Sequence, residues 1–410
     1  MKKLIAVVAI MLLIAFGITF NATKESRKET RISFASWGSQ SEVVILKSLI
    51  SEFEKENPDI KVDFMHIPQN YFPKIHLLFA SRLAPDVIFM NNIYAPVYIK
   101  AGLLEDLSSY FKGEIENKVF YSDSIKSFSN DSAVYGIPRD ISYMVIYYNK
   151  GIFNKTKTPY PNSDWTLNDF LKTAQKVRTK DNFSINFEDN SLFWLNYLSA
   201  LNGGIFSDGA SKIILDSKGS IDGLNFYSDL IFKYHLMPTK SEMCSKTGAQ
   251  MFINGNLAMY LSGRWMVPKF REVVTFDWDI ANFPSKGGKI FNTSSAWTIS
   301  KSSKNKEAAV KFIKFISSEK ASEEFAKSGL IVPARVKIAE SDIFLAPQKS
   351  PKHSEYFINE LPNSKPLETN ENYNQINDII NEALEPVFNG TKTAERAITK
   401  DLIGKLNKLL

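Results

Sequence analysis

Two spacings of apolar residues alternate along the chain between residues 32 and 90. Short apolar runs of strand length occupy 32–37, 60–67 and 85–90. Between them, apolar residues recur every three or four positions over 43–53 and 75–82, which is the spacing of an amphipathic helix. The third run is apolar without interruption from Val87, as in strands that are covered on both faces of a parallel sheet. Strand, helix, strand, helix and strand in this order predict an α/β fold.

Aromatic and polar residues follow two of these predicted strands. Trp37 ends the first strand, and Asn91 and Asn92 follow the third. Parallel sheets of α/β proteins bind ligands beyond the carboxyl ends of their strands. We therefore expect these residues to lie beside a polar organic ligand.

The rest of the chain is richer in helical spacing. Helices are predicted at 165–177, with Ser163 or Asp164 near its cap, and at 192–201, 222–234, 305–317, 321–327 and 373–388. The chain of 410 residues is long enough for two or three domains, or for one body with two lobes. It has no internal repeat and no long low-complexity linker.

The first 31 residues have the pattern of an export signal. Lys2 and Lys3 precede an apolar run over 4–20, and a polar stretch follows. The apolar run has the length of a long signal peptide or of a short membrane-spanning helix. We predict that residues 1–22 are a signal peptide or an uncleaved N-terminal anchor and that 23–31 are a polar linker. The protein is then exported to the periplasm or to the outer face of the cytoplasmic membrane.

The basic charge of the chain is concentrated in this leader. The net charge is +6, and residues 1–31 account for +4 of it, so the remainder is nearly neutral. We therefore expect no nucleic-acid partner. The single cysteine, Cys244, excludes a disulfide within the chain, and the four histidines are scattered. We expect no metal site and no cofactor.

Five blocks of sequence, taken in order, resemble those of one protein family. They are PDVIF at 85–89 with AGLL at 101–104, YGIPRD at 135–140 with YYNK at 147–150, FINGNLAM at 252–259 with SGRW at 262–265, KNKEAA at 304–309, and GLIVPAR at 329–335. The blocks are similar to those of the family 1 extracellular solute-binding proteins of bacterial ABC importers. Their order and spacing over residues 32–400 carry the resemblance.

The resemblance implies a two-lobed α/β fold of the type II periplasmic binding protein class. Hinge crossings are expected near 138–141, 291–296 and 317–319. Lobe 1 is then formed by 32–138 and 296–317, and lobe 2 by 142–291 and 320–410. The resemblance also implies a monomeric receptor without enzymatic activity. A small-molecule ligand closes the lobes, and the permease subunits of an ABC transporter read the closed form.

Aromatic residues are the first candidates for the site, because a sugar presents C–H faces that stack on flat rings. The candidates are Trp37, Trp194, Trp265, Trp297 and Tyr373. Trp265 follows an apolar strand and matches a ligand-stacking tryptophan of the maltose-binding group. For Trp194 the alternative is packing in the core, and for Trp297 it is packing at the hinge.

Hydrogen-bonding side chains complete the predicted site, because sugar hydroxyls need planar polar partners. The candidates are Glu42, Asn91, Asn92, Arg139, Asp140, Asp189, Arg264, Ser295 and Arg335. Arg139 and Asp140 could instead form an ion pair that fixes the hinge, Glu42 could favour a helix dipole, and Arg264 and Arg335 could join the lobes. Residues 90–94 lack the charged contacts that maltose-binding protein has there, which argues against maltose itself.

A receptor for a sugar or oligosaccharide is the favoured function, and two alternatives stay open. A binding protein for a glycerol phosphodiester, a peptide or a polyamine is the first. A phosphate ligand would be indicated if Arg139, Arg264 and Arg335 met without carboxylate partners. The second is an exported carbohydrate hydrolase, which would need two carboxylates at a set separation. No GxSxG, P-loop or GxGxxG motif supports an enzyme.

Overall fold

The computed structural model describes residues 29–188 and 190–410. The predicted leader at 1–22 and the candidate Asp189 lie outside the described residues. Of the linker predicted at 23–31, Thr30 and Arg31 belong to the first strand, and residues 23–28 lie outside the described residues. In the described part of the chain, no helix is long and apolar enough to cross a membrane.

The first sheet contains the strands that open the described chain. Its strands are β1 (Thr30–Ser36), β2 (Ile60–His66), β3 (Val87–Asn91), β6 (Gly136–Ser142), β11 (Ile290–Ile299) and β12 (Ser364–Pro366). β1 lies between β2 and β3 and is parallel to both, and β11 is antiparallel to β3. The helices α2 (Gln40–Glu56) and α3 (Tyr71–Ala80) connect the three parallel strands. The alternation predicted from residues 32–90 is therefore confirmed.

The second sheet has the strand order β10 (Trp278–Asn282), β7 (Val145–Asn149), β9 (Leu257–Ser262) and β8 (Phe183–Asn186). β8 and β9 are parallel, so their carboxyl ends lie at the same edge. One buried cluster joins this sheet to apolar residues of α8 (Leu167–Val177), α9 (Ser191–Ala200), α10 (Lys218–Phe232) and α17 (Tyr373–Phe388). We call the parts built on the two sheets the first half and the second half.

Shorter elements complete the described chain. They are α4 (Ala95–Lys100), α5 (Lys112–Glu116), α6 (Ser122–Lys126), β4 (Ser129–Asn130), β5 (Ala133–Val134), α7 (Lys150–Lys155), η1 (Asp208–Ala210), α11 (Gly248–Ile253), η2 (Arg264–Met266), α12 (Val267–Val273), α13 (Lys306–Ile316), α14 (Glu319–Ser328), α15 (Val336–Ala339), α16 (Asp342–Leu345), η3 (Ser354–Phe357), η4 (Leu361–Asn363), α18 (Ala394–Ala397) and α19 (Lys400–Asn407).

The six helices predicted after residue 160 are confirmed, with ends that differ by at most four residues. α8 starts later than predicted because Thr166, not Ser163 or Asp164, caps it and forms a capping box with Asp169. Trp165 stays outside the helix and is buried, with its indole N–H donating to the carbonyl of Asn282.

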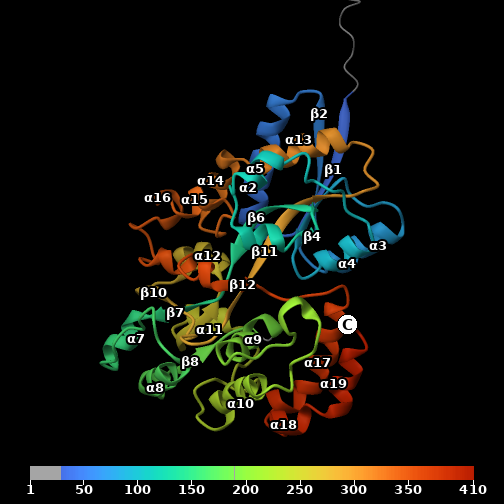
Figure 1. Cartoon of the computed structure of the whole chain (residues 1–410). Coiled ribbons are helices and arrows are strands. Elements are labelled where there is room, and N and C mark those ends of the chain that lie inside the picture. The colour runs from blue at the N-terminus through green and yellow to red at the C-terminus, as the bar shows by residue number, and fades with distance from the viewer. Residues whose placement is uncertain (1–28, 189) are drawn as a thin grey trace, which may run out of the picture.

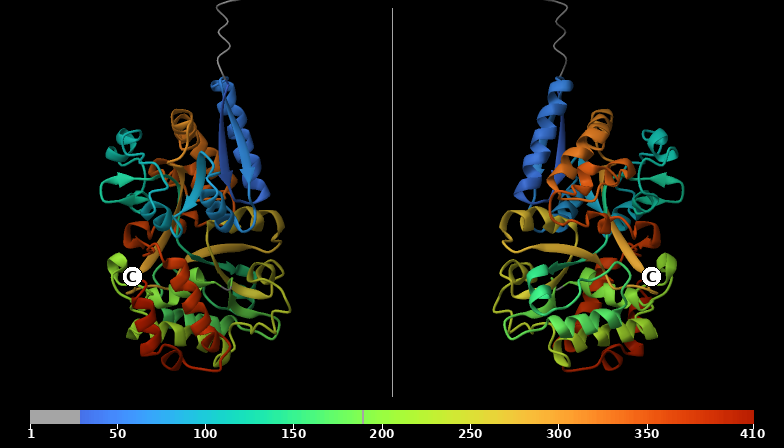
Figure 2. Two further views of the ribbon diagram at one scale, coloured as in Figure 1. Left: turned by 90° about the vertical axis from the view of Figure 1, so that its right-hand side faces the viewer. Right: turned by 90° about the vertical axis from the view of Figure 1, so that its left-hand side faces the viewer.

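Two antiparallel strands, β6 and β11, connect the halves. β11 is a single long strand that runs from the second half into the first (Figure 1). Its residue Ala296 faces Pro138 of β6, and a register shift follows Ser295. The side views show the same division, with α2 in one half and α17 to α19 in the other (Figure 2). The predicted crossings at 138–141 and 291–296 fall on these two strands.

A third crossing is predicted near 317–319. Beyond it, the buried residues of α14 and of the segment that follows divide between two clusters. Phe325, Leu330 and Ala334 belong to the cluster of the first half. Ala326 and Val332 belong to a cluster of the second half. The segment 325–334 therefore packs between the two halves.

Candidate functional site

A cavity of about 200 Å³ lies where β6, β11 and the ends of β1 and β9 come together. Seven predicted site residues line it: Trp37, Glu42, Arg139, Asp140, Arg264, Trp265 and Ser295. Larger cavities of about 430 and 660 Å³ lie in the second half, but no tryptophan lines either of them. We take the smaller cavity as the candidate site, because a tryptophan from each half and several charged groups meet there.

Trp37 forms the aromatic wall on the side of the first half. It follows the last residue of β1, and its ring lies 4.1 Å from that of Phe89 and 5.0 Å from that of Tyr71, measured between centroids. The side chain is half-buried. Packing against two other rings fixes the orientation of this indole before any ligand binds.

Trp265 forms the aromatic wall on the side of the second half, and it is 40% exposed. It lies in η2, just after β9. A Cβ atom at Gly263 would fall 2.0 Å from the indole ring, so only glycine leaves room for the ring there. The hydroxyl of Tyr147 donates to the carbonyl oxygen of Gly263 over 2.7 Å and holds the turn in place.

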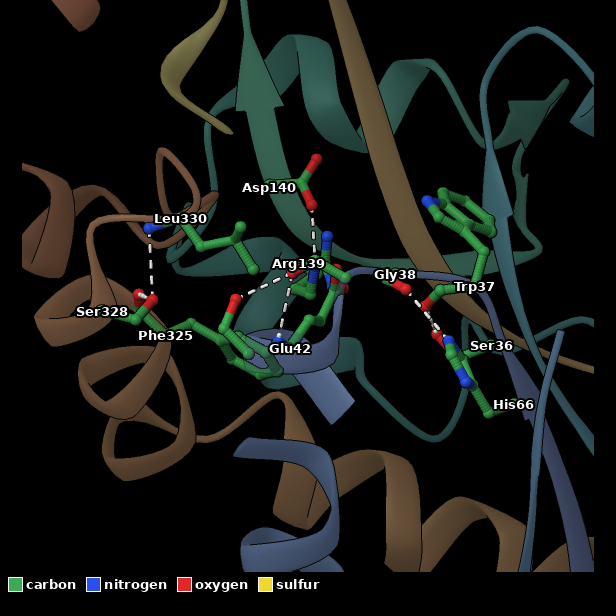
Figure 3. Close-up of polar contacts among 12 residues, drawn as sticks. Ser36, Trp37, Gly38, Glu42, His66, Arg139, Asp140, Phe325, Ser328 and Leu330 are labelled. Carbon is green, nitrogen blue, oxygen red and sulfur yellow. Dashed lines mark hydrogen bonds and ion pairs between the residues drawn. The ribbon is translucent and has the colours of Figure 1, made fainter. Parts of the chain in front are cut away.

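Arg139 forms a buried ion-pair network at the base of the cavity (Figure 3). Its Nη1 donates to the carboxylate of Glu42, and its Nε donates to Oδ2 of Asp140 over 2.7 Å. Its side chain is only 8% exposed, and its guanidinium lies 4.0 Å from the centroid of the Phe89 ring. Burial lowers the pKa of Arg139, but the two carboxylates outweigh burial and raise it. The ion pair expected as the alternative for Arg139 and Asp140 is therefore present.

Gly38 makes this network possible. Its φ is 137°, a value that favours glycine, and a Cβ atom there would lie 2.3 Å from Oε2 of Glu42. Ser39 caps α2, and its hydroxyl accepts the amide N–H of Glu42. The first turn of α2 thus presents the Glu42 carboxylate to Arg139 from across the sheet.

Arg264 lines the cavity but is held by the protein, with 1% of its surface exposed. Nε donates to the carbonyl of Gly329, Nη2 to that of Phe344, and Nη1 to the hydroxyl of Ser354. Burial lowers the pKa of Arg264 to about 9. Arg264 is a candidate either for ligand binding or for joining the lobes. These contacts support a role in joining parts of the chain.

Three aromatic candidates lie in the core and do not line the cavity. Trp297 is fully buried against Phe34 and Phe89, and Trp194 is 2% exposed beside Phe388. Tyr373 is 3% exposed and borders the cavity of about 430 Å³ in the second half. For Trp194 and Trp297 the core and hinge alternatives describe the observed packing.

Three polar candidates also lie outside the cavity lining, and each has a structural partner. Asn91 Oδ1 accepts the N–H of Tyr94, and Asn92 Oδ1 accepts that of Ser294. Arg335 Nε donates to the carbonyl of Ser317 over 2.5 Å. All three side chains therefore stabilise turns or strand ends.

The cavity also contains residues that the sequence analysis did not select. They are Ser142, Thr293, Leu330, Ile331 and Val332. Ser142 and Thr293 stand two positions from Asp140 and Ser295 on their strands, so the two-residue period of a strand places them on the same face. That signal could have found them. The segment 330–332 also lines the cavity, but it lies in no predicted strand or helix and has no such local signal.

Comparison with known proteins assigns the family. The model of the bacterial extracellular solute-binding proteins matches residues 37–323. The chain therefore belongs to this family, whose members are solute-binding proteins of ABC transporters and not enzymes. The family is extracellular or periplasmic, and it implies a small-molecule ligand and a permease as partners.

Relatives with known ligands share the fold along most of the chain. The galactooligosaccharide-binding protein of Bacillus subtilis is 26% identical over 70% of this chain and 69% of its own. An ABC substrate-binding protein from Listeria monocytogenes in complex with cycloalternan has a TM-score of 0.83 and 25% identity, over 93% of this chain and 98% of its own. UgpB from Mycobacterium tuberculosis, in complex with glycerophosphocholine, has a TM-score of 0.80 and 16% identity, over 92% and 98%. The predicted class of periplasmic binding protein fold is confirmed.

No group of three or more histidine, cysteine, aspartate or glutamate side chains within 29–188 and 190–410 could hold a metal ion. The candidate cavity is lined by two indole rings, hydroxyl groups and charged side chains that pair with one another.

Proposed function

We propose that the protein is the receptor of an ABC importer that binds a sugar or oligosaccharide between its two halves. The observation that carries this proposal is the pairing of Trp37 and Trp265 on opposite walls of one cavity. Aromatic rings suit the C–H faces of a sugar. The hydroxyls of Ser142, Thr293 and Ser295, and the carboxylate of Asp140, suit its rim of hydroxyl groups.

A neutral ligand fits this site better than an anionic one. The guanidinium of Arg139 is already paired with two carboxylates, that of Arg264 donates to three protein oxygens, and that of Arg335 lies outside the cavity lining. The convergence of unpaired guanidiniums that a glycerol phosphodiester would need is therefore missing from these three residues. This argues against that alternative despite the structural similarity to UgpB.

A polyamine is disfavoured by the same network. A polycation would need carboxylates that are free to pair with it. The carboxylates of Glu42 and Asp140 both accept from Arg139, and their side chains are 6% and 13% exposed. A polyamine would have to displace a buried guanidinium in order to reach them.

The two halves act as lobes that close over the ligand, with β6, β11 and the segment 330–334 as the hinge. Lobe 1 then comprises 32–138 and 296 to about 330, and lobe 2 comprises 142–291 and the rest of the chain. A ligand that contacts Trp37 and Trp265 together stabilises only the closed form, which is the form that a permease would recognise. We further propose a monomer outside the cytoplasmic membrane, exported or anchored through residues 1–22.

A ligand screen tests the function. Monosaccharides, disaccharides and oligosaccharides, with glycerophosphocholine, spermidine and short peptides as the other solute classes, are each added to the purified protein. A bound sugar raises the melting temperature by mass action and changes tryptophan fluorescence, because two indoles line the cavity. If the whole sugar panel leaves both signals unchanged while another solute class shifts them, the carbohydrate assignment is wrong.

A further inference from the structure

A second cavity lies beside the strands that join the halves. Its volume is about 430 Å³, within the range of roughly 300–1,000 Å³ that is typical of small-molecule sites. One wall consists of Lys289 to Phe291 at the start of β11 and of Lys365 to Glu368 in and after β12. The other wall is the loop 203–214 that follows α9. A ligand here would touch the hinge strands and the body of the second half at the same time.

The floor of this cavity is apolar and rigid. Its side chains are buried in the core of the second half: Leu195, Ile205, Phe206, Phe291 and Tyr373. The rings of Phe206 and Tyr373 lie 6.0 Å apart, centroid to centroid. Such a floor suits an aliphatic or aromatic side chain of a ligand.

The rim carries two lysines that share one carboxylate. Nζ of Lys365 lies 3.3 Å from Oδ2 of Asp208, and Nζ of Lys289 lies 3.5 Å from Oδ1. The hydrogen bond from Lys365 and the charge of Lys289 lower the pKa of Asp208. The two lysines carry two positive charges and Asp208 carries one negative charge, so one positive charge remains. A ligand carboxylate would balance it.

Glu368 carries the opposite charge on the same cavity. Its side chain is half-buried and lines the cavity, and within the described part of the chain it has no ion-pair partner. A partly buried carboxylate that has no ion-pair partner is stabilised by a ligand ammonium group.

We propose that this cavity binds an α-amino acid with a large apolar side chain. The carboxylate of the amino acid binds at Lys289 and Lys365, its ammonium group binds at Glu368, and its side chain lies on the apolar floor. β11 runs on from Phe291 to Thr293 and Ser295, which line the candidate solute site. Binding of the amino acid is therefore coupled to solute binding, and the coupling is reciprocal.

Gly204 offers a way to fill the cavity without disturbing the fold. It lines the cavity, and a Cβ atom there would have its nearest neighbour at 3.7 Å, an ordinary van der Waals distance. Gly204→Val therefore adds an apolar side chain to the lining of the cavity, beside Ile214, with no close contact of its Cβ atom. Gly203 differs, because a Cβ atom there would lie 2.3 Å from the backbone nitrogen of Ser220.

The test is calorimetric titration of the purified protein with L-phenylalanine, 3-phenylpropionate and phenethylamine. The last two share the phenyl ring but each lack one of the two charges. We expect phenylalanine to bind and each analogue to bind at least about tenfold more weakly, the loss of one charged hydrogen bond. Gly204→Val and Glu368→Gln should lose binding. Lys212→Gln is the control for the loss of one charge near the cavity, because Lys212 is an exposed residue of the loop 203–214 that does not line the cavity. This variant should bind phenylalanine as the natural protein does.

The proposal is overturned if phenylalanine at millimolar concentration does not bind, if it binds Gly204→Val as it binds the natural protein, or if either analogue binds as tightly. A circular dichroism spectrum and a melting curve of Gly204→Val establish that the variant is folded. Once the solute is known, its affinity with and without phenylalanine should differ in the natural protein and not in Gly204→Val. Amino-acid binding is measured without sugar, so its failure leaves the proposed carbohydrate function standing.

Discussion

The two tryptophans of the candidate site differ in what supports each ring. Trp37 packs on Phe89 and Tyr71, whereas Trp265 lies on the backbone of Gly263 and is 40% exposed. Trp265 can therefore accept the face of a sugar without leaving a packed core. We expect it to be the main aromatic contact of the ligand.

Trp265→Ala tests this role. Loss of a central aromatic contact should weaken sugar binding by about 2 kcal/mol or more. The melting temperature should change little, because much of the ring is already in water. Calorimetry with the sugar found by the screen measures the affinity. Tyr160→Ala is the control, since Tyr160 is also 40% exposed but does not line the cavity. Normal affinity in Trp265→Ala would make this tryptophan a structural residue.

Gly38→Ala tests the support of the ion-pair network. The new methyl group would meet the Glu42 carboxylate and push it away from Arg139. Gly102→Ala is the matched control, because Gly102 also has a positive φ, of 64°, but a methyl group there would have no neighbouring atom within 4 Å. Denaturant unfolding should show that Gly38→Ala costs more than the control, by about 1–3 kcal/mol for displaced buried groups. Equal losses would mean that backbone strain alone matters at Gly38.

The sequence could identify candidate residues for the site but not their burial. Trp194, Trp297 and Tyr373 have the composition and position of ligand platforms, yet all three are buried. An aromatic ring contributes to a core and to a sugar site through the same apolar surface, so local sequence does not distinguish the two uses. The packing of other elements around each ring decides between them.

At the scale of elements, Arg264 connects η2 to distant parts of the chain. Its three donors reach Gly329 at the end of α14, Phe344 in α16 and Ser354 in η3. One side chain thus fixes the segment 329–354 to the end of β9. Arg264 and Trp265 are neighbours in η2, so the position of the Trp265 ring depends on the three hydrogen bonds of Arg264.

Arg264→Ala should destabilise the protein strongly. Three buried oxygen acceptors lose their donor, at about 1 kcal/mol or more each. Arg264→Lys should not restore the stability, because one ammonium group does not reproduce the planar fork of donors. Unfolding in urea gives the free energy of each variant. If Arg264→Ala unfolds like the natural protein, the three hydrogen bonds do not hold the segment. If it loses sugar affinity without losing stability, Arg264 is a ligand contact instead.

At the scale of the whole molecule, closure of the two halves is the central expectation. Within the described residues, β6, β11 and the segment around 330–334 link the halves near the candidate site, and Trp37 and Trp265 belong to different halves. A ligand that touches both rings should therefore bring the halves together.

Small-angle scattering tests closure. Addition of the sugar should reduce the radius of gyration of the natural protein, and the same concentration should leave Trp265→Ala unchanged. An unchanged radius in the natural protein, at a concentration where calorimetry shows saturation, would mean that binding takes place without closure.

The sequence by itself determined the α/β class, the three parallel strands of the first half and six later helices. These features follow from local spacing of apolar residues and from short motifs, so they are readable along the chain. Tertiary structure alone decided how the segment after α14 packs between the halves, the fixation of Arg264 and the choice between core and cavity for each tryptophan. These depend on contacts between residues tens to hundreds of positions apart, such as Arg264 with Phe344, and no local pattern contains them.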